Sequence, residues 1–177
     1  MTFDRGLVTL RPLCEADVDS ILTWVNDREV VGNIAAFSGE PFTREDELAY
    51  VARIQASDVD RVFSVFAADD SRYLGQVGLH QIHRRSKVGR LSCIIGSRAE
   101  MGKGLGTGAI ANLLDVAFGE EGLHKVWLMV FERNERAQRV YSKIGFLEEG
   151  RLREEYLHEG GWHTMVRMGL LAREWSR

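Results

Sequence analysis

Four glycines occupy alternate positions, Gly102, Gly104, Gly106 and Gly108, immediately before a run with a helical pattern, AIANLLDVAF. An apolar, strand-like run from 91 to 95 precedes them. Glycine has no Cβ atom, so successive backbone N–H groups can crowd together. At a helix N-terminus such groups point outward with the positive end of the helix dipole behind them. The segment therefore predicts a binding site for a phosphate or pyrophosphate group.

Two common phosphate loops fit this segment poorly. A Walker loop, G-x-x-x-x-G-K-[ST], fails because the Gly–Lys pair at 102–103 is followed by glycine, and position 97 is not glycine. The dinucleotide fingerprint G-x-G-x-x-A matches Gly104, Gly106 and Ala109. It should follow its strand almost at once, whereas eight residues separate Ile95 from Gly104. A nicotinamide-dependent oxidoreductase is therefore the weaker alternative.

A second constellation lies at 134–146, NERAQRVYSKIGF. Asn134 is a good helix N-cap, and Tyr141 lies on the apolar face of the helix that would follow. Taken alone, these residues are an ordinary cap and an ordinary core aromatic. A nearly continuous apolar strand, 125–131, separates this segment from the glycine-rich one.

Together the two segments resemble motifs A and B of the GNAT N-acetyltransferase superfamily. Motif A, [QR]-x-x-G-x-[GA], falls on 101–106 with Met101 at its first position, and motif B, N-x-x-A-x-x-x-Y-x-x-x-G-F, matches at every fixed position. The resemblance implies acetyl-CoA as cosubstrate and direct attack of a primary amine on its thioester. It also implies that Tyr141 protonates the leaving thiolate as general acid. The residues expected to bind acetyl-CoA are Ile94, Ile95, Gly96, Met101, Gly102, Lys103, Gly104, Leu105, Gly106, Thr107, Asn134, Ala137 and Lys143.

The implied fold is an α/β (α+β) GNAT fold, in which helices flank a central, mixed but mostly antiparallel and splayed sheet. The hydrophobic pattern agrees with this fold. Strands are expected at 8–13, 62–67, 73–82, 88–95, 125–131 and twice between 146 and 171, and helices at 16–25, from Thr43, after the glycines and from Asn134. The segment 26–39 is expected to be irregular. The strand ending at Ile95 would separate from the next and offer a backbone N–H to the developing oxyanion.

The attacking amine must lose a proton. A lysine-like amine with a pKa near 10.4 is only about 0.04% neutral at pH 7, a penalty of about 4.6 kcal/mol, whereas an α-amine with a pKa near 7.8 pays about 1 kcal/mol. The candidate bases, none of which is assigned, are His80, Glu40, Glu154 and Glu155. Cys93 is a poor candidate for an acylated nucleophile, because its apolar neighbours raise a thiol pKa.

Composition sets the remaining expectations. The chain has 177 residues and a net charge of −3, which predicts a single domain over 1–177 and argues against a nucleic-acid binder. No apolar run is long enough to span a bilayer, and Cys14 and Cys93 lack metal-ligand spacing. We therefore expect a cytoplasmic enzyme with no metal, no nucleic-acid partner and no membrane association.

The acceptor is left open by the sequence. The run HQIHRR and the C-terminal segment 148–171 are similar to the spermidine and the ribosomal-protein N-terminal acetyltransferase branches of the superfamily. The expected substrate is a small-molecule primary amine such as a polyamine or an amino sugar, and the alternative is a peptide N-terminus. A non-catalytic acyl-CoA sensor is a further alternative, which retention of Tyr141 disfavours. A homodimer or larger homo-oligomer is a possible assembly.

Overall fold

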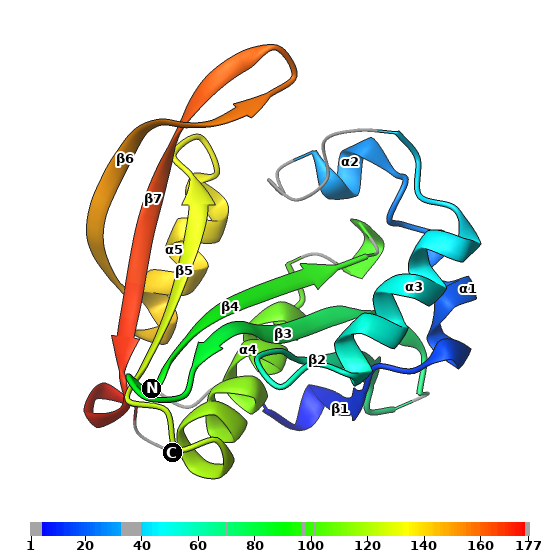
Figure 1. Cartoon of the computed structure of the whole chain (residues 1–177), viewed down its shortest axis with the longest axis horizontal. Coiled ribbons are helices and arrows are strands. Elements are labelled where there is room, and N and C mark those ends of the chain that lie inside the picture. The colour runs from blue at the N-terminus through cyan, green and yellow to red at the C-terminus, as the bar shows by residue number, and fades with distance from the viewer. Residues whose placement is uncertain (1–4, 33–39, 70, 97, 101, 176–177) are drawn as a thin grey trace.

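The computed structural model describes residues 5–32, 40–69, 71–96, 98–100 and 102–175. Within these ranges, seven strands form one sheet with the order β1-β2-β3-β4-β5-β7-β6 (Figure 1). The strands are β1 (Val8–Pro12), β2 (Arg61–Ala67), β3 (Tyr73–His83), β4 (Val88–Ile95), β5 (Lys125–Phe131), β6 (Leu147–His158) and β7 (Gly161–Leu171). The helices are α1 (Val18–Leu22), α2 (Arg28–Val31), α3 (Arg44–Gln55), α4 (Leu105–Asp115) and α5 (Glu135–Ile144).

The sheet divides in its middle. Its neighbouring strands pair antiparallel, except for β4 and β5, which run parallel. That parallel pairing covers three residues of each strand and ends at the pair Arg90–Trp127. Beyond this pair, β4 stays with β3 and β5 stays with β7, and the two halves of the sheet diverge (Figure 1). The predicted mixed, mostly antiparallel and splayed sheet is confirmed.

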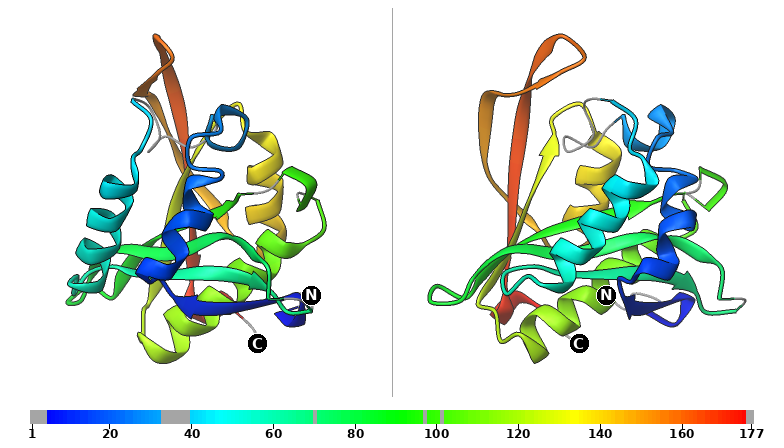
Figure 2. Two further views of the ribbon diagram at one scale, coloured as in Figure 1. Left: turned by 90° about the vertical axis from the view of Figure 1, so that its right-hand side faces the viewer. Right: turned by 45° about the vertical axis from the view of Figure 1, so that its right-hand side comes forward.

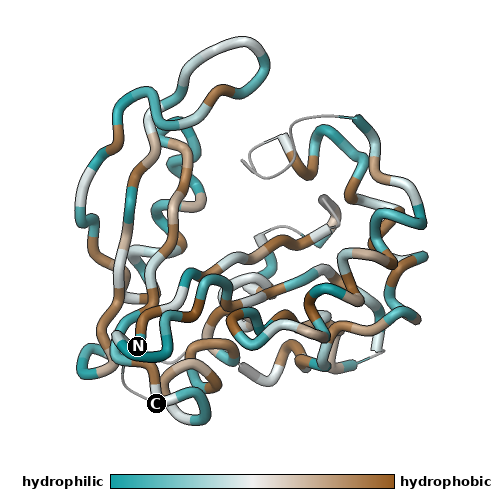
Figure 3. Tube along the Cα trace, viewed as in Figure 1, coloured by the Kyte–Doolittle hydropathy of each residue, from teal (hydrophilic) through white to brown (hydrophobic). Residues whose placement is uncertain are grey.

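Two hydrophobic clusters lie on opposite faces of the sheet. The larger one contains the apolar face of α4, including Ala109, Leu113 and Leu114, together with the inward residues of β3 and β5. The smaller one joins α1 and α3 to β2, with Val51 at its centre. Figure 2 shows α1 and α3 on one side of the sheet and α4 on the other. Hydrophobic residues recur along β5 and α4, whereas hydrophilic residues are frequent along β6 (Figure 3).

Local signals explain most element boundaries. Thr43 caps α3, since its side chain accepts a hydrogen bond from the Asp46 N–H while the Asp46 carboxylate accepts one from the Thr43 N–H. Gly145 ends α5 with a φ of 119°, a conformation that suits glycine. The predicted strands and hairpins correspond to those in the structure, and a turn at 159–160 joins β6 to β7.

Two expectations about the first third of the chain are wrong in part. The helix expected at 16–25 is split into a 3-10 turn at Glu15–Asp17 and the short α1. The segment expected to be irregular after residue 26 contains α2, which begins because Asp27 caps it by accepting from the Glu29 N–H. Residues 33–39 of that segment lie outside the described ranges.

Candidate active site

The N-terminus of α4 carries backbone N–H groups with no helical partner. The first intrahelical hydrogen bond runs from the Gly108 N–H to the Gly104 carbonyl at 2.9 Å. The N–H groups of Leu105, Gly106 and Thr107 precede it, and among the described residues no side chain caps the helix. Gly104 is the N-cap residue and has a φ of 83°, so a residue with a Cβ would be strained there. This helix end can bind an anion such as a pyrophosphate.

The end of β4 lies against this helix end. A Cβ built on Gly106 would lie 3.4 Å from Cγ1 of Ile95. The Gly96 N–H donates to the Leu74 carbonyl, toward β3, at 2.7 Å. Because backbone polar groups alternate between the two edges of a strand, Ile95 and Cys93 direct theirs toward the separated β5. An extended chain with amide groups can pair with such an open strand edge.

Tyr141 approaches the same region from α5. Its ring packs against the larger cluster, with its centroid 5.9 Å from that of Phe146. Burial, followed by the charge of Cys93, raises the pKa of Tyr141, so its hydroxyl stays protonated at neutral pH. The thiol of Cys93 lies 4.0 Å from the Gly106 carbonyl, and burial raises its pKa to about 12. The structure thus brings together β4, the start of α4 and Tyr141.

The opposite face of the sheet, which packs against α1 and α3, carries several buried polar side chains and is called the polar face below. Ser64 is fully buried and donates to Oδ2 of the buried Asp17 at 2.7 Å. Further along this face lie Gln76 of β3, which is 8% exposed, and Arg90 of β4, whose buried Nε has no partner among the described residues. The carboxyl group of Glu47, on α3, is 5% exposed, and burial raises its pKa. Few side chains of this polarity are buried without a function.

Comparison with known proteins identifies this arrangement. The model of the acetyltransferase (GNAT) domain matches residues 8–147. The chain belongs to the GNAT acetyltransferase family. It is 31% identical over 165 residues to the spermidine N(1)-acetyltransferase of Vibrio cholerae, covering 93% of this chain and 92% of that protein. It is 34% identical over 107 residues to a candidate ribosomal N-acetyltransferase of Bacillus subtilis, an alignment that spans 60% of this chain and 58% of the relative.

Solved structures give the same result. The crystal structure of the Vibrio cholerae spermidine N-acetyltransferase in complex with CoA and spermine matches with a TM-score of 0.87 and 28% identity. The match covers 96% of this chain and 98% of that one. The resemblance predicted from motifs A and B is thereby confirmed, and the chain is an acetyl-CoA-dependent N-acetyltransferase.

The remaining described residues predicted to bind acetyl-CoA lie at the start of α4 and on α5. The Asn134 side-chain oxygen accepts from the Ala137 N–H at 3.1 Å, so the asparagine caps α5 while its amide NH2 group can still donate to a ligand. Lys103 pairs with Glu100 at 3.2 Å, and Lys143 is exposed on the last turn of α5. The side chain of Leu105 is buried in the core, so any ligand contact must come from its backbone. Met101 lies outside the described residues.

The candidate bases differ in their exposure to solvent. Glu40, Glu154 and Glu155 are exposed, as a solvated surface residue would be. His80 is mostly buried on the polar face, 2.9 Å from Ser92 and 3.0 Å from Asp60. No sequence pattern connects Asp60 with His80, because they lie 20 residues apart. The pairing of β2 with β3 brings them together.

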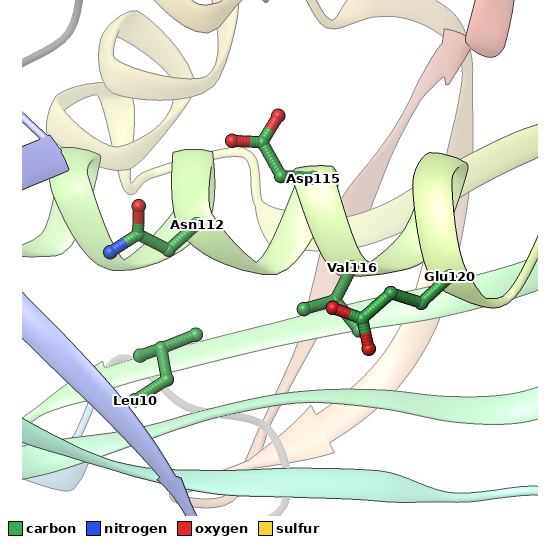
Figure 4. Close-up of a pocket in the computed structure, with 5 residues that line it drawn as sticks. All are labelled: Leu10, Asn112, Asp115, Val116 and Glu120. Carbon is green, nitrogen blue, oxygen red and sulfur yellow. The ribbon is translucent and has the colours of Figure 1, made fainter.

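A hollow beside the C-terminal half of α4 does not belong to this site. It lies between β1 and α4 and is lined by Leu10, Asn112, Asp115, Val116 and Glu120 (Figure 4). Two of its polar groups already connect elements, since Asn112 donates to the Val8 carbonyl and Asp115 accepts from the Trp175 indole. In the part of the chain that the structure describes, no group of three or more His, Cys, Asp or Glu residues could hold a metal ion. No helix there is long and apolar enough to cross a membrane.

Proposed function

We propose that this enzyme transfers the acetyl group of acetyl-CoA to a primary amine of a small, cationic molecule of the polyamine type. The observation that carries the proposal is the separation of β4 from β5 beside the free N-terminus of α4, with a polar face opposite. Full-length similarity to spermidine acetyltransferases supports the choice of amine. The buried carboxyl groups of Asp17 and Glu47 on the α1–α3 side also suit a cationic acceptor.

In this proposal the cosubstrate lies between the two halves of the sheet. The N–H groups of residues 102–107 bind the pyrophosphate, and the first position of that motif, Met101, adds at most one side-chain contact. The open edge of β4, in the stretch Ile94, Ile95 and Gly96, pairs with the amides of the pantetheine arm through the backbone groups of Ile95, while Ile94 and Gly96 flank this contact. Asn134, Ala137 and Lys143 contact the coenzyme from α5.

The chemical step is a direct attack of the amine nitrogen on the thioester carbon. The N–C bond forms, the C–S bond breaks, and the Tyr141 hydroxyl gives its proton to the departing thiolate. Burial raises the pKa of Tyr141, so its hydroxyl is protonated throughout the neutral range and carries the proton that this step requires. The pKa of about 12 for Cys93 argues against an acyl-cysteine intermediate.

A second acceptor class is a protein N-terminus. The similarity to the Bacillus subtilis candidate ribosomal N-acetyltransferase favours it, although that alignment covers a smaller share of both chains. Such a substrate has a lower amine pKa and therefore needs less help with deprotonation. We further propose a cytoplasmic location and a homo-oligomeric assembly.

The experiment follows the release of free CoA thiol from acetyl-CoA against a panel of polyamines, amino sugars, aminoglycosides and peptide N-termini. Polyamines should give the highest kcat/KM. A higher kcat/KM with peptides would move the assignment to protein N-termini. Absence of release with every amine, while CoA still raises the melting temperature, would make the chain an acyl-CoA sensor.

A further inference from the structure

Three side chains from neighbouring strands form a hydrogen-bonded line on the polar face of the sheet. The Nδ1 atom of His80 lies 3.0 Å from Oδ1 of Asp60, and its Nε2 atom lies 2.9 Å from Oγ of Ser92. A carboxylate can only accept, so Nδ1 carries the proton and donates it to Asp60. The Nε2 atom is then an acceptor, and the Ser92 hydroxyl donates to it.

Several features hold this line in place. The side chains of His80 and Asp60 are 14% and 12% exposed, and Ser57 donates a second hydrogen bond to Asp60 at 2.7 Å. Gly78, the cross-strand neighbour of Ser92, leaves the space that the imidazole fills, since a Cβ there would lie 3.1 Å from Nε2 of His80. The register of β3 shifts just after His80, a device that commonly redirects side chains beside active sites.

Ser92 lies where an attacking amine would enter. It is two residues beyond Arg90, the last residue of β4 that pairs with β5. The next residue on the same face, Ile94, packs against the α1–α3 cluster, while Cys93 packs against the other cluster. Ser92 therefore faces the side of the separated strands opposite to Tyr141, which is the side left for an acceptor.

Burial and two neighbouring arginines favour the neutral form of His80. Burial lowers the pKa of His80, the hydrogen bond and charge of Asp60 oppose this, and the positive charges of Arg90 and Arg53 lower it further. Arg90 is the cross-strand partner of His80 on β4, and Arg53 reaches Asp60 from α3 at 4.0 Å. Asp60 stays ionised, because its hydrogen bonds to Ser57 and His80 outweigh the effect of burial and lower its pKa.

We propose that Ser92, His80 and Asp60 form the proton relay that deprotonates the acceptor amine. This inference rests on the proposed function of the site. The ammonium N–H bond breaks as its proton passes to Oγ of Ser92, whose own proton moves to Nε2 of His80. The freed electron pair of the nitrogen attacks the thioester carbon. Asp60 stabilises the imidazolium, which then returns its proton to solvent.

The need for such a relay follows from the substrate. An amine with a pKa near 10.4 is about 0.04% neutral at pH 7. The positive charge of Arg90 disfavours a second cation nearby, so it helps to expel the proton from both the amine and the imidazole. Positioned proton transfer of this kind contributes about 100- to 10,000-fold to a rate.

The test compares His80→Gln and Ser92→Ala with wild type, using spermidine as acceptor, over pH 6 to 10. Both variants should lose about 100-fold or more in kcat/KM at pH 7. The deficit should shrink toward pH 10, because the amine then loses its proton to water. His83→Gln is the matched control, since this exposed histidine ends the same strand and should leave kcat/KM unchanged. CoA should raise the melting temperature of all four proteins equally.

Three results would overturn the relay. Equal kcat/KM for His80→Gln and wild type would remove His80 from the proton path. A deficit that stays constant with pH would assign His80 a structural role alone. Accumulation of acetylated Ser92 with acetyl-CoA in the absence of amine would make the serine a nucleophile instead. A separate result would overturn the proposed function itself, namely a wild-type enzyme that releases no thiol with any amine of the panel.

Discussion

Replacing Gly104 by alanine strains the backbone at the start of α4 without creating a steric clash. Its φ is 83°, and the nearest atom to a new Cβ would be Cδ1 of Leu7 at an ordinary 3.8 Å. Gly122 is a matched control. It has a φ of 61°, nothing lies within 4 Å of a new Cβ, and it lies beyond the C-terminal end of the same helix. Each alanine should cost about 1–2 kcal/mol of stability, the usual penalty for a left-handed L-residue.

The two variants should differ in cosubstrate binding. Relief of the strain at Gly104 rotates the first turn of α4 and misaligns the N–H groups of residues 105–107. One lost charge-assisted hydrogen bond costs about 1.5–3 kcal/mol, which is roughly a 10- to 150-fold weaker affinity for CoA. Gly122→Ala leaves these groups in place and should keep the wild-type affinity.

Two measurements separate the effects. Thermal unfolding should show similar losses for both variants, at about 2–4 °C for each kcal/mol in a chain of this size. Thiol release at varied acetyl-CoA should show a raised KM for Gly104→Ala alone. An equal KM for the two variants would refute the assignment of the pyrophosphate to this helix end, whatever their melting temperatures.

Three further substitutions test other parts of the structure. Tyr141→Phe should lower kcat by about 100-fold or more with little change in KM for acetyl-CoA. A pre-steady-state measurement should show a slower chemical step, and an unchanged rate of that step would exclude Tyr141 as the acid. Cys93→Ala should keep most of the activity between pH 7 and 9, because a thiol with a pKa of about 12 supplies almost no thiolate there, and complete inactivation would reopen covalent catalysis. Gly96→Ala should lower the free energy of unfolding by about 1–3 kcal/mol, because its Cβ would lie 2.4 Å from two ring atoms of the buried Trp24. Denaturant unfolding should be compared with that of Gly150→Ala, whose new Cβ would have nothing within 4 Å, and equal stabilities of the two variants would contradict the packing argument.

The parts of the site that depend on local backbone geometry could be predicted from the sequence. Alternate glycines before a helix already predict free N–H groups, because glycine permits a φ such as the 83° of Gly104. The cap at Asn134 and the stop at Gly145 follow equally from short-range rules. These features involve residues within a few positions of one another, so the printed order of the chain is enough to recognise them.

The polar face could not be predicted in the same way. Ser64 and Asp17 are 47 residues apart, and Asp60 and His80 are 20 apart, so only the folded structure shows that they meet. Residue type alone would also misplace two positions of α3. Glu47 is buried and Ala52 is exposed, because the helix turns the carboxyl group of Glu47 toward the polar strands rather than toward solvent.

The division of the sheet explains why the two kinds of feature differ. The α4 side is apolar, and we propose that it binds the coenzyme through backbone groups at a glycine-rich helix start, which is a local pattern visible in the sequence. On the α1–α3 side, the proposed recognition and proton transfer depend on side chains contributed by separate strands and helices. The two sides meet where β4 separates from β5. There the adjacent residues Ser92 and Cys93 face opposite sides of the sheet, Ser92 toward His80 and Cys93 toward the α4 cluster. In the proposed mechanism, an acyl group delivered along one side meets an amine deprotonated on the other, and we expect that the acceptor can change without disturbing the helix end proposed to bind the coenzyme.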